Sequence, residues 1–338
     1  MHLFELLPEA RRESVDAALR SVFAAAAVGD ARPISGGVSG ALIYRIEVRS
    51  RPYVLRIEPE RIALADRQRG FACMSSAAAA GFAPRVHFAD PAMGVAIMDF
   101  VASRPLSEHP GGAEGLARAL GELVRGVQAS EPFPASGAYP VLIAKLLDGL
   151  QGSTLAGPGE FERHVEGLES IRAALAWSAS SMVPAHNDPN PRNLLFDGER
   201  LWLIDWELGF RNDPLVDVAI LTTELARPPA LQDILLEAAF GRPPDRAQRA
   251  RLETIRLLTR LFYGCVVLDG LRGTLTSDPR PDLPTFSPSG FAAAVADGRL
   301  TSGTPETAYA FARMSLAAFA DGVSAPDFDG MLAMAGPD

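Results

Sequence analysis

Four polar residues with fixed spacing suggest chemistry in the middle of the chain: His186, Asp188, Asn193 and Asp205. A short apolar run follows Asn193, then an Asp-Gly turn signal, then a second apolar run that ends at Asp205. Two apolar runs around an Asp-Gly pair predict a β-hairpin. Because a hairpin brings its two ends together, we expect Asn193 to lie beside Asp205. Two oxygen ligands side by side would suit a hard cation such as Mg²⁺ that carries phosphates.

This segment resembles the catalytic loop of kinase-like phosphotransferases that act on small molecules. Residues 186–193 read H-N-D-P-N-P-R-N, which matches the H-x-D-x-x-x-x-N loop of the aminoglycoside phosphotransferase and choline/ethanolamine kinase family. Residues 204–207 read I-D-W-E, which matches its I-D-W or I-D-F segment and looks more like the choline/ethanolamine kinase branch. A hairpin with a capping Asp and a turn Asn would explain residues 197–198, but not the other polar residues together.

The resemblance implies an α+β, protein-kinase-like fold with two lobes. Residues 1–101 would form a small nucleotide-binding lobe with an antiparallel sheet that ends in a hinge. Residues 102–338 would form a mostly helical lobe with the catalytic loop and the acceptor pocket. The resemblance also implies transfer of the γ-phosphate of ATP, with Mg²⁺, to a hydroxyl of a small-molecule acceptor.

The same resemblance implies a role for each polar residue. Asp188 would accept the proton of the attacking hydroxyl, while Asn193 and Asp205 would bind Mg²⁺. His186 would pack behind the metal-binding Asp as a structural residue. Asp217, at the start of an apolar segment, would brace the catalytic loop, and its surroundings look like the downstream pattern of the family.

A segment rich in Ser and Gly near the N-terminus is a candidate for binding the phosphates of the nucleotide. Glycines let a backbone approach phosphate oxygens, and serine hydroxyls can donate hydrogen bonds to them. A Gly-Gly hairpin turn without any ligand is an equal alternative. The position of the segment before two predicted strands favours a phosphate loop, whose candidate residues are Ser35, Gly36, Gly37, Ser39 and Gly40.

Arg56, in the sequence V-L-R-I, occupies the position at which protein kinases carry a Lys that contacts the α- and β-phosphates. Lys145 is the single lysine of the chain, so an arginine must take that role here. Arginine is permanently charged and can bind two oxygens at once; the alternative is an exposed Arg on an edge strand. In the hinge, the resemblance implies that main-chain groups of Asp99 and Val101 bind the adenine edge.

The helix expected over residues 64–80 departs from the family pattern. The resemblance implies a Glu in this helix that pairs with the phosphate-binding base, but the segment contains none. Arg69 or Gly70 falls near the expected position, and Asp66 is the nearest acid. Two interpretations stay open: either Asp66 holds Arg56, or Arg56 relies on the nucleotide alone.

Signals for the identity of the acceptor are weak. The acids available for acceptor contacts are Glu207, Asp213 and Glu224. Choline kinases surround a quaternary ammonium group with aromatic rings, because cations bind ring faces. The rings considered in the C-terminal half are Trp206, Phe210, Phe262 and Tyr263. Aminoglycoside enzymes use many carboxylates near the C-terminus, and this chain has few there. A choline- or ethanolamine-like amino alcohol is favoured over an aminoglycoside or a sugar.

Two other functions compete with a small-molecule kinase. A catalytically silent nucleotide-binding scaffold is supported by the missing helix Glu, but Asp188, Asn193 and Asp205 are all retained, which a silent protein would not need. A protein kinase is disfavoured because no A-P-E segment follows Asp205 at a useful distance. The D-W-E sequence also replaces the D-F-G that an activation loop needs.

The composition of the chain indicates which kinds of partner and which location to expect. The chain has 338 residues, enough for two lobes, and 48% of them are hydrophobic, as in ordinary globular proteins. A formal net charge of -9 without a basic run argues against nucleic acid and anionic membranes as partners. Cys73 and Cys265 lack metal-ligand spacing. No signal-peptide pattern and no apolar run of about 18 residues is found, so we expect a cytoplasmic protein. The oligomeric state is left open.

Apolar spacing predicts the elements that position these residues. Strands are expected over the second half of residues 34–48, over 53–57, from 86 onward and over 94–101. Helices are expected over residues 9–28, 64–80, 115–127, 145–150, 161–177, 216–225, 231–240, 246–268 and 305–319. Residues 272–289, rich in Pro, Ser, Thr and Asp, are expected to form a long loop that either serves as a lid or is mobile.

Overall fold

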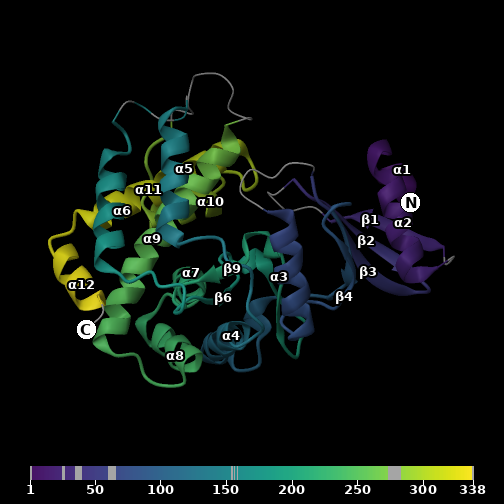
Figure 1. The fold of residues 1–338 in the computed structure, drawn as a ribbon, viewed down its shortest axis with the longest axis horizontal. Coiled ribbons are helices and arrows are strands. Elements are labelled where there is room, and N and C mark those ends of the chain that lie inside the picture. The colour runs from purple at the N-terminus through teal and green to yellow at the C-terminus, as the bar shows by residue number, and fades with distance from the viewer. Residues whose placement is uncertain are drawn as a thin grey trace. The chain divides into compact units, whose positions relative to one another are not determined.

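The computed structural model describes residues 2–24, 27–34, 40–59, 66–153, 155, 157, 159–272 and 283–336 (Figure 1). The chain forms two compact units. Unit 1 consists of Met1–Ala135, Val183–Arg211 and Glu224–Arg242, and unit 2 of Ser136–Met182, Asn212–Thr223 and Pro243–Asp338. The predicted boundary between lobes at residues 101 and 102 stays a prediction. No helix in the described ranges is long and apolar enough to cross a membrane.

An antiparallel sheet forms the N-terminal part of unit 1, as predicted, but it has five strands, and the first of them was not predicted. Its strand order is β1-β2-β3-β5-β4. The strands are β1 (Val28–Pro33), β2 (Leu42–Val48), β3 (Arg51–Ile57), β4 (Val86–Asp90) and β5 (Val95–Asp99). Alternate side chains of β2 are buried, as a half-covered sheet requires. The buried face packs against helix α2 (Arg12–Phe23), and the short α1 (Leu3–Leu6) adds to the same core.

The prediction of one helix over residues 9–28 is wrong at both ends. The segment begins with a 3-10 turn over Glu9–Arg11, α2 ends at Phe23, and β1 begins at Val28. Ala24 ends the helix in a left-handed conformation, with a φ of 55°. The run of alanines favours helix by propensity alone, but the pairing of β1 with β2 outweighs that preference.

The predicted hairpin after the catalytic loop is confirmed. Strand β7 (Leu194–Phe196) pairs antiparallel with β8 (Leu201–Leu203). The turn between them is built by Asp197, whose Oδ1 accepts hydrogen bonds from the backbone N–H groups of Glu199 and Arg200 at 2.8 Å. The hairpin lies between the short 3-10 helices η3 (Pro191–Asn193) and η4 (Trp206–Leu208). Sequence patterns missed the flanking strands β6 (Val183–Ala185) and β9 (Phe210–Asn212), which pair with each other.

The helices largely follow the predicted spacing. Those not yet named in unit 1 are α3 (Arg67–Ala79), the 3-10 turn η2 (Leu106–Glu108), α4 (Gly112–Gln128) and α8 (Pro229–Phe240). Most or all of each remaining helix belongs to unit 2: α5 (Tyr139–Gln151), α6 (Glu162–Ala174), α7 (Val216–Glu224), α9 (Arg246–Leu271), α10 (Pro288–Ala296), α11 (Pro305–Val323) and α12 (Phe328–Ala335). In unit 2, α9 packs against α5, α6, α11 and α12. Helices α10 and α12 were not predicted.

The long loop expected over residues 272–289 is only partly visible. Residues 273–282 lie outside the described residues, so the question of a lid lies outside them too. Helix α10 begins at Pro288, inside the predicted loop, with Ser287 as its N-cap.

Packing between α4 and α8 generates a first prediction. A Cβ at Gly121 of α4 would overlap the carbonyl oxygen of Leu235 and lie 2.7 Å from the Cβ of Ala238, both in α8. Gly121→Ala should therefore lower the free energy of unfolding by about 1–3 kcal/mol, since the helix backbone cannot yield. Urea denaturation measures this. The matched control is Gly270→Ala in α9, where no atom of the described residues would lie within 4 Å of the added Cβ; it should raise the free energy of unfolding by up to about 1 kcal/mol. Equal effects in the two variants would contradict the steric argument.

Candidate active site

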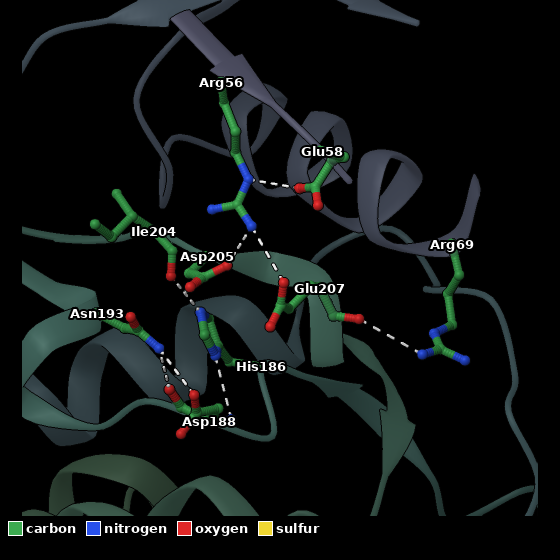
Figure 2. Close-up of polar contacts among 9 residues, drawn as sticks. All are labelled: Arg56, Glu58, Arg69, His186, Asp188, Asn193, Ile204, Asp205 and Glu207. Carbon is green, nitrogen blue, oxygen red and sulfur yellow. Dashed lines mark hydrogen bonds and ion pairs between the residues drawn. The ribbon is translucent and has the colours of Figure 1, made fainter. Parts of the chain in front are cut away.

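Asp188 lies in the loop between β6 and η3 with its carboxylate held by two amides. Its Oδ1 accepts a hydrogen bond from Asn190 Nδ2 at 2.9 Å. Its Oδ2 accepts one from Asn193 Nδ2 at 3.0 Å (Figure 2). The residue is partly exposed, so the carboxylate can be reached from solvent. A partly exposed, oriented carboxylate is suited to accept a proton from a hydroxyl group.

The hairpin brings Asn193 to the residues around Asp205, as predicted. The backbone oxygen of Asn193 accepts a hydrogen bond from the N–H of Ile204 at 3.0 Å. Asp205 follows β8 in a left-handed conformation, with φ 66° and ψ 63°. Asp tolerates this region better than most residues because its short polar side chain can bond locally. Such conformations are concentrated at functional sites.

The side chains of Asn193 and Asp205 fit a hard cation. Asn193 Nδ2 donates to the backbone oxygen and to Oδ2 of Asp188, and Asn193 Oδ1 points away from these bonds (Figure 2). That oxygen accepts no hydrogen bond from the described residues. Among the described residues, no group of three or more His, Cys, Asp and Glu side chains could hold a metal ion. A Mg²⁺ at this place would therefore take the rest of its oxygen ligands from phosphates and water.

Arg56 on β3 is buried among three carboxylates. Its Nε donates a hydrogen bond to Glu58 Oε1 at 2.6 Å, and its Nη2 lies 2.8 Å from Asp205 Oδ1 and 3.2 Å from Glu207 Oε2 (Figure 2). Burial alone would lower the pKa of the guanidinium, but the charges of Asp205 and Glu58 outweigh it and raise that pKa. The alternative of an exposed Arg on an edge strand is wrong, because β3 lies between β2 and β5.

Neither earlier interpretation of the Arg56 partner is correct. Asp66 caps α3, where its Oδ1 accepts a hydrogen bond from the N–H of Arg69 at 3.2 Å. Arg56 is instead paired with Glu58 and with the acids of the D-W-E segment. A sequence signal for Glu58 existed, since residues two apart on an extended chain point to the same side. No sequence signal indicated that Glu207 would also reach Arg56.

Glu207 is the carboxyl group of this cluster whose charged form is disfavoured. Burial first, and then the charge of Asp205, raise the pKa of Glu207 to about 8, although Arg56 opposes the shift. Three carboxylates thus share one guanidinium. A divalent cation at Asp205 would offset this surplus, which is consistent with the oxygen donors described above.

His186 links the catalytic loop to the hairpin. The ring is fully buried; its Nε2 donates to the backbone oxygen of Ile204 at 2.8 Å, and its Nδ1 accepts from the N–H of Asp188 at 3.3 Å. Burial lowers the pKa of His186 to about 4, so the ring is neutral near pH 7. It also packs on Trp206, with ring centroids 4.5 Å apart. This geometry fits a structural residue.

The nucleotide-binding candidates are partly described. Ser35, Gly36, Gly37 and Ser39 lie outside the described residues. Gly40, just before β2, has a φ of 73°, which glycine adopts without strain. The N–H of Asp99 is already bonded to the backbone oxygen of Arg85 at 2.9 Å. The main chain of Val101 makes no hydrogen bond with the described residues, so it is available to an adenine edge.

The acceptor candidates lie in different environments. The carboxylate of Asp213 is fully buried and bound by Arg251 and by the N–H of Leu215. Asp217 is buried in the first turn of α7. Glu224 is exposed at the end of α7, and Glu207 faces Arg56. Contacts of Glu207, Asp213 and Glu224 with an acceptor stay predictions, and so does the expected role of Asp217 in bracing the catalytic loop.

The four aromatic rings considered for an ammonium cage are mostly buried. Trp206 packs edge-on against Phe133, and its ring also contacts the tilted ring of His186. Phe210 is buried beneath the guanidinium of Arg69, and Phe262 packs on Tyr139. Tyr263 alone of the four is partly exposed.

Comparisons with known proteins match both the motifs and the fold. Residues 30–252 match the model of the phosphotransferase enzyme family, APH. Over 54 residues the chain is 44% identical to protein LicA of Haemophilus influenzae; this stretch covers 16% of the chain and 20% of that protein. The match thus spans about a fifth of the length of that relative.

Solved structures share the fold over nearly the whole chain. A choline/ethanolamine kinase family protein from Mesorhizobium loti is 25% identical, with a TM-score of 0.67 over 96% of this chain and 99% of that one. Choline kinase LicA from Streptococcus pneumoniae is 14% identical, with a TM-score of 0.63 over 92% and 100%. The predicted α+β, protein-kinase-like fold class is confirmed.

Burial of neutral His186 predicts a pH dependence of stability. An unfolded His has a pKa of about 6.5, whereas the folded value is about 4. Between these values the unfolded chain binds more protons, so the stability present above pH 6.5 is lost as pH falls toward 4. The slope should be up to about 1.4 kcal/mol per pH unit.

His186→Gln removes the titrating ring, so its free energy of unfolding should depend less on pH between 6.5 and 4 than that of the wild type. Urea denaturation at several pH values measures both slopes. His2→Gln, at an exposed histidine, is the matched control and should keep the wild-type slope. An unchanged slope in His186→Gln would show that the buried ring is not held neutral.

Proposed function

Because the chain belongs to the phosphotransferase enzyme family, as its motifs predicted, we propose that it transfers the γ-phosphate of ATP, with Mg²⁺, to a hydroxyl group of a small molecule. The observation that carries this proposal is the convergence of Asp188, Asn193 and Asp205 within unit 1. Asn193 lies 3.0 Å from the carboxylate of Asp188 and bonds through its backbone to Ile204, the neighbour of Asp205.

Each residue of the site has its own role in the proposed phosphoryl transfer. Asp188 orients the acceptor hydroxyl and takes its proton while the oxygen bonds to the γ-phosphorus and the bond to the ADP oxygen breaks. Asn193 and Asp205 hold Mg²⁺, which neutralises charge on the phosphates when bound. Arg56 binds phosphate oxygens, which suits its buried, permanently charged guanidinium. His186 holds the catalytic loop against the hairpin through its hydrogen bonds.

The nucleotide is held at two further places in this proposal. The loop with Ser35, Gly36, Gly37, Ser39 and Gly40 covers the phosphates, and Gly40, its described residue, has a positive φ of 73°. The main chain of Val101, which makes no hydrogen bond with the described residues, binds the adenine edge, with Asp99 beside it. We also propose a cytoplasmic location. It is consistent with the two free cysteines and with the proposed use of ATP.

A choline- or ethanolamine-like amino alcohol is the proposed acceptor. Support comes from the 25% identity with a choline/ethanolamine kinase family protein over nearly the full length of both chains. The burial of Trp206, Phe210 and Phe262 argues against a cage made of those rings, so ethanolamine, sugars and aminoglycosides belong in the same test. The alternative is a catalytically silent nucleotide-binding scaffold.

Asp188→Asn tests the proposed base. It should reduce ATP turnover by about 10²–10⁴-fold, because general-base catalysis contributes that much, while the affinity for Mg·ATP stays close to that of the wild type. Coupled ATP consumption is measured with choline, ethanolamine, sugars and aminoglycosides, and calorimetry gives the affinity. Asp321→Asn, at an exposed Asp of α11, is the control. Binding of Mg·ATP by the wild type without turnover of any acceptor would favour the silent scaffold.

Asp205→Asn tests the proposed metal ligand. The Mg²⁺ concentration that half-maximally enhances ADP binding should rise at least about tenfold, since losing even an outer partner of a metal ligand weakens metal binding by that much. A Mg²⁺ titration at fixed ADP gives this value. An unchanged titration curve would exclude Asp205 as a ligand, and Asp321→Asn should leave the curve unchanged.

A further inference from the structure

We propose that Glu58 is the positioning residue for Arg56, and through it for the nucleotide phosphates, in the role that a helix acid was expected to fill. The proposal rests on the proposed function for the identity of the ligand. Its geometry lies wholly within unit 1, where β3 carries Arg56 and Glu58 follows at the end of that strand.

The contact between the two side chains fixes one edge of the guanidinium. Glu58 Oε1 lies 2.6 Å from Arg56 Nε, and the two residues are only 5% and 8% exposed. A charge-assisted hydrogen bond to Nε determines the plane of the group. The Nη2 atom is thereby directed at Asp205 and Glu207, where the phosphates and their cation would lie (Figure 2).

The backbone of Glu58 is itself held from several elements. Its N–H donates to the backbone oxygen of Gly94 at 2.8 Å. Its backbone oxygen accepts from Arg11 Nη2 at 2.7 Å, at the start of α2. Arg67, the first residue of α3, donates to the next backbone oxygen along the chain, that of Pro59. These hydrogen bonds therefore fix the backbone from which the carboxylate of Glu58 extends.

Helix α3 has neither an acid nor the space for one at the corresponding place. Arg67–Ala79 contains no Asp or Glu, and the preceding Asp66 is used as its N-cap. A Cβ at Gly70 would lie 3.2 Å from the Cα of Glu207, so the helix packs directly on the D-W-E segment. Glu58 is the buried acid left to hold Arg56 Nε.

We expect Glu58 to position Arg56 through the hydrogen bond to Nε, and its negative charge to matter less for that position. The carboxylate of Asp205 lies 2.8 Å from Arg56 Nη2 and balances its single positive charge without Glu58. One oxygen of Glu58, Oε2, is buried without a hydrogen-bond partner among the described residues, so only Oε1 is used. A glutamine offers the same acceptor atom without the charge and should therefore preserve the position of Arg56.

Binding of ADP and of adenosine to Glu58→Ala and Glu58→Gln tests this, with calorimetry in the presence of Mg²⁺. Glu58→Ala should weaken ADP binding about tenfold, the loss expected for an outer partner of a ligand-binding group. Glu58→Gln should stay within about threefold of the wild type, since it retains the hydrogen bond. Adenosine, which lacks phosphates, should bind all three proteins equally.

The controls separate the possible outcomes. Glu47→Ala and Glu47→Gln, on neighbouring β2 where the side chain is 37% exposed, should bind ADP like the wild type. Weaker adenosine binding in Glu58→Ala would indicate a disturbed lobe and contradict the proposal. Wild-type ADP affinity in Glu58→Ala, or equal losses in Glu58→Ala and Glu58→Gln, would also overturn it. A wild type that does not bind ADP at all would instead refute the proposed function.

Discussion

The site depends on the hydrogen bond from the N–H of Ile204 to the backbone oxygen of Asn193, which closes the hairpin at the catalytic loop. The backbone oxygen of the same Ile204 accepts the hydrogen bond of His186. Both main-chain groups of one residue are thus bound to the loop that carries Asp188. Because Asn193 also reaches the Asp188 carboxylate, a shift of the hairpin would move the carboxylate of Asp188 and the oxygens of Asn193 and Asp205 together.

The second constraint is charge. Arg56 is surrounded by Glu58, Asp205 and Glu207, and such an excess of buried carboxylates is costly without a compensating cation. The raised pKa of Glu207 is the direct consequence, because burial and the neighbouring Asp205 both disfavour its charged form. A cluster with this imbalance is well suited to bind a divalent cation and its phosphates, since both Arg56 and the carboxylates then gain a partner of opposite charge.

Local sequence patterns were enough to predict the hairpin, most helices and the closeness of Asn193 to the residues around Asp205, because each depends on residues close in the chain. The end of the first helix could not be predicted, since the pairing of β1 with β2 decides it against alanine propensity. The partners of Arg56 could not be predicted from the sequence for a related reason. Glu207 lies far along the chain from Arg56, and it belongs to the D-W-E segment on which α3 packs at Gly70. No local sequence pattern indicates such contacts between distant segments.

The position of Glu58 changes what α3 contributes to the site. In protein kinases an ion pair between the phosphate-binding Lys and a helix Glu must form for activity, so movement of that helix can switch the enzyme. Here the acid that holds Arg56 Nε follows two residues later on the same chain segment, and its backbone is bonded to Gly94. The separation between Glu58 and Arg56 is therefore limited by covalent geometry rather than by the placement of α3. Alignment of Arg56 through Glu58 thus does not require a helix to swing inward.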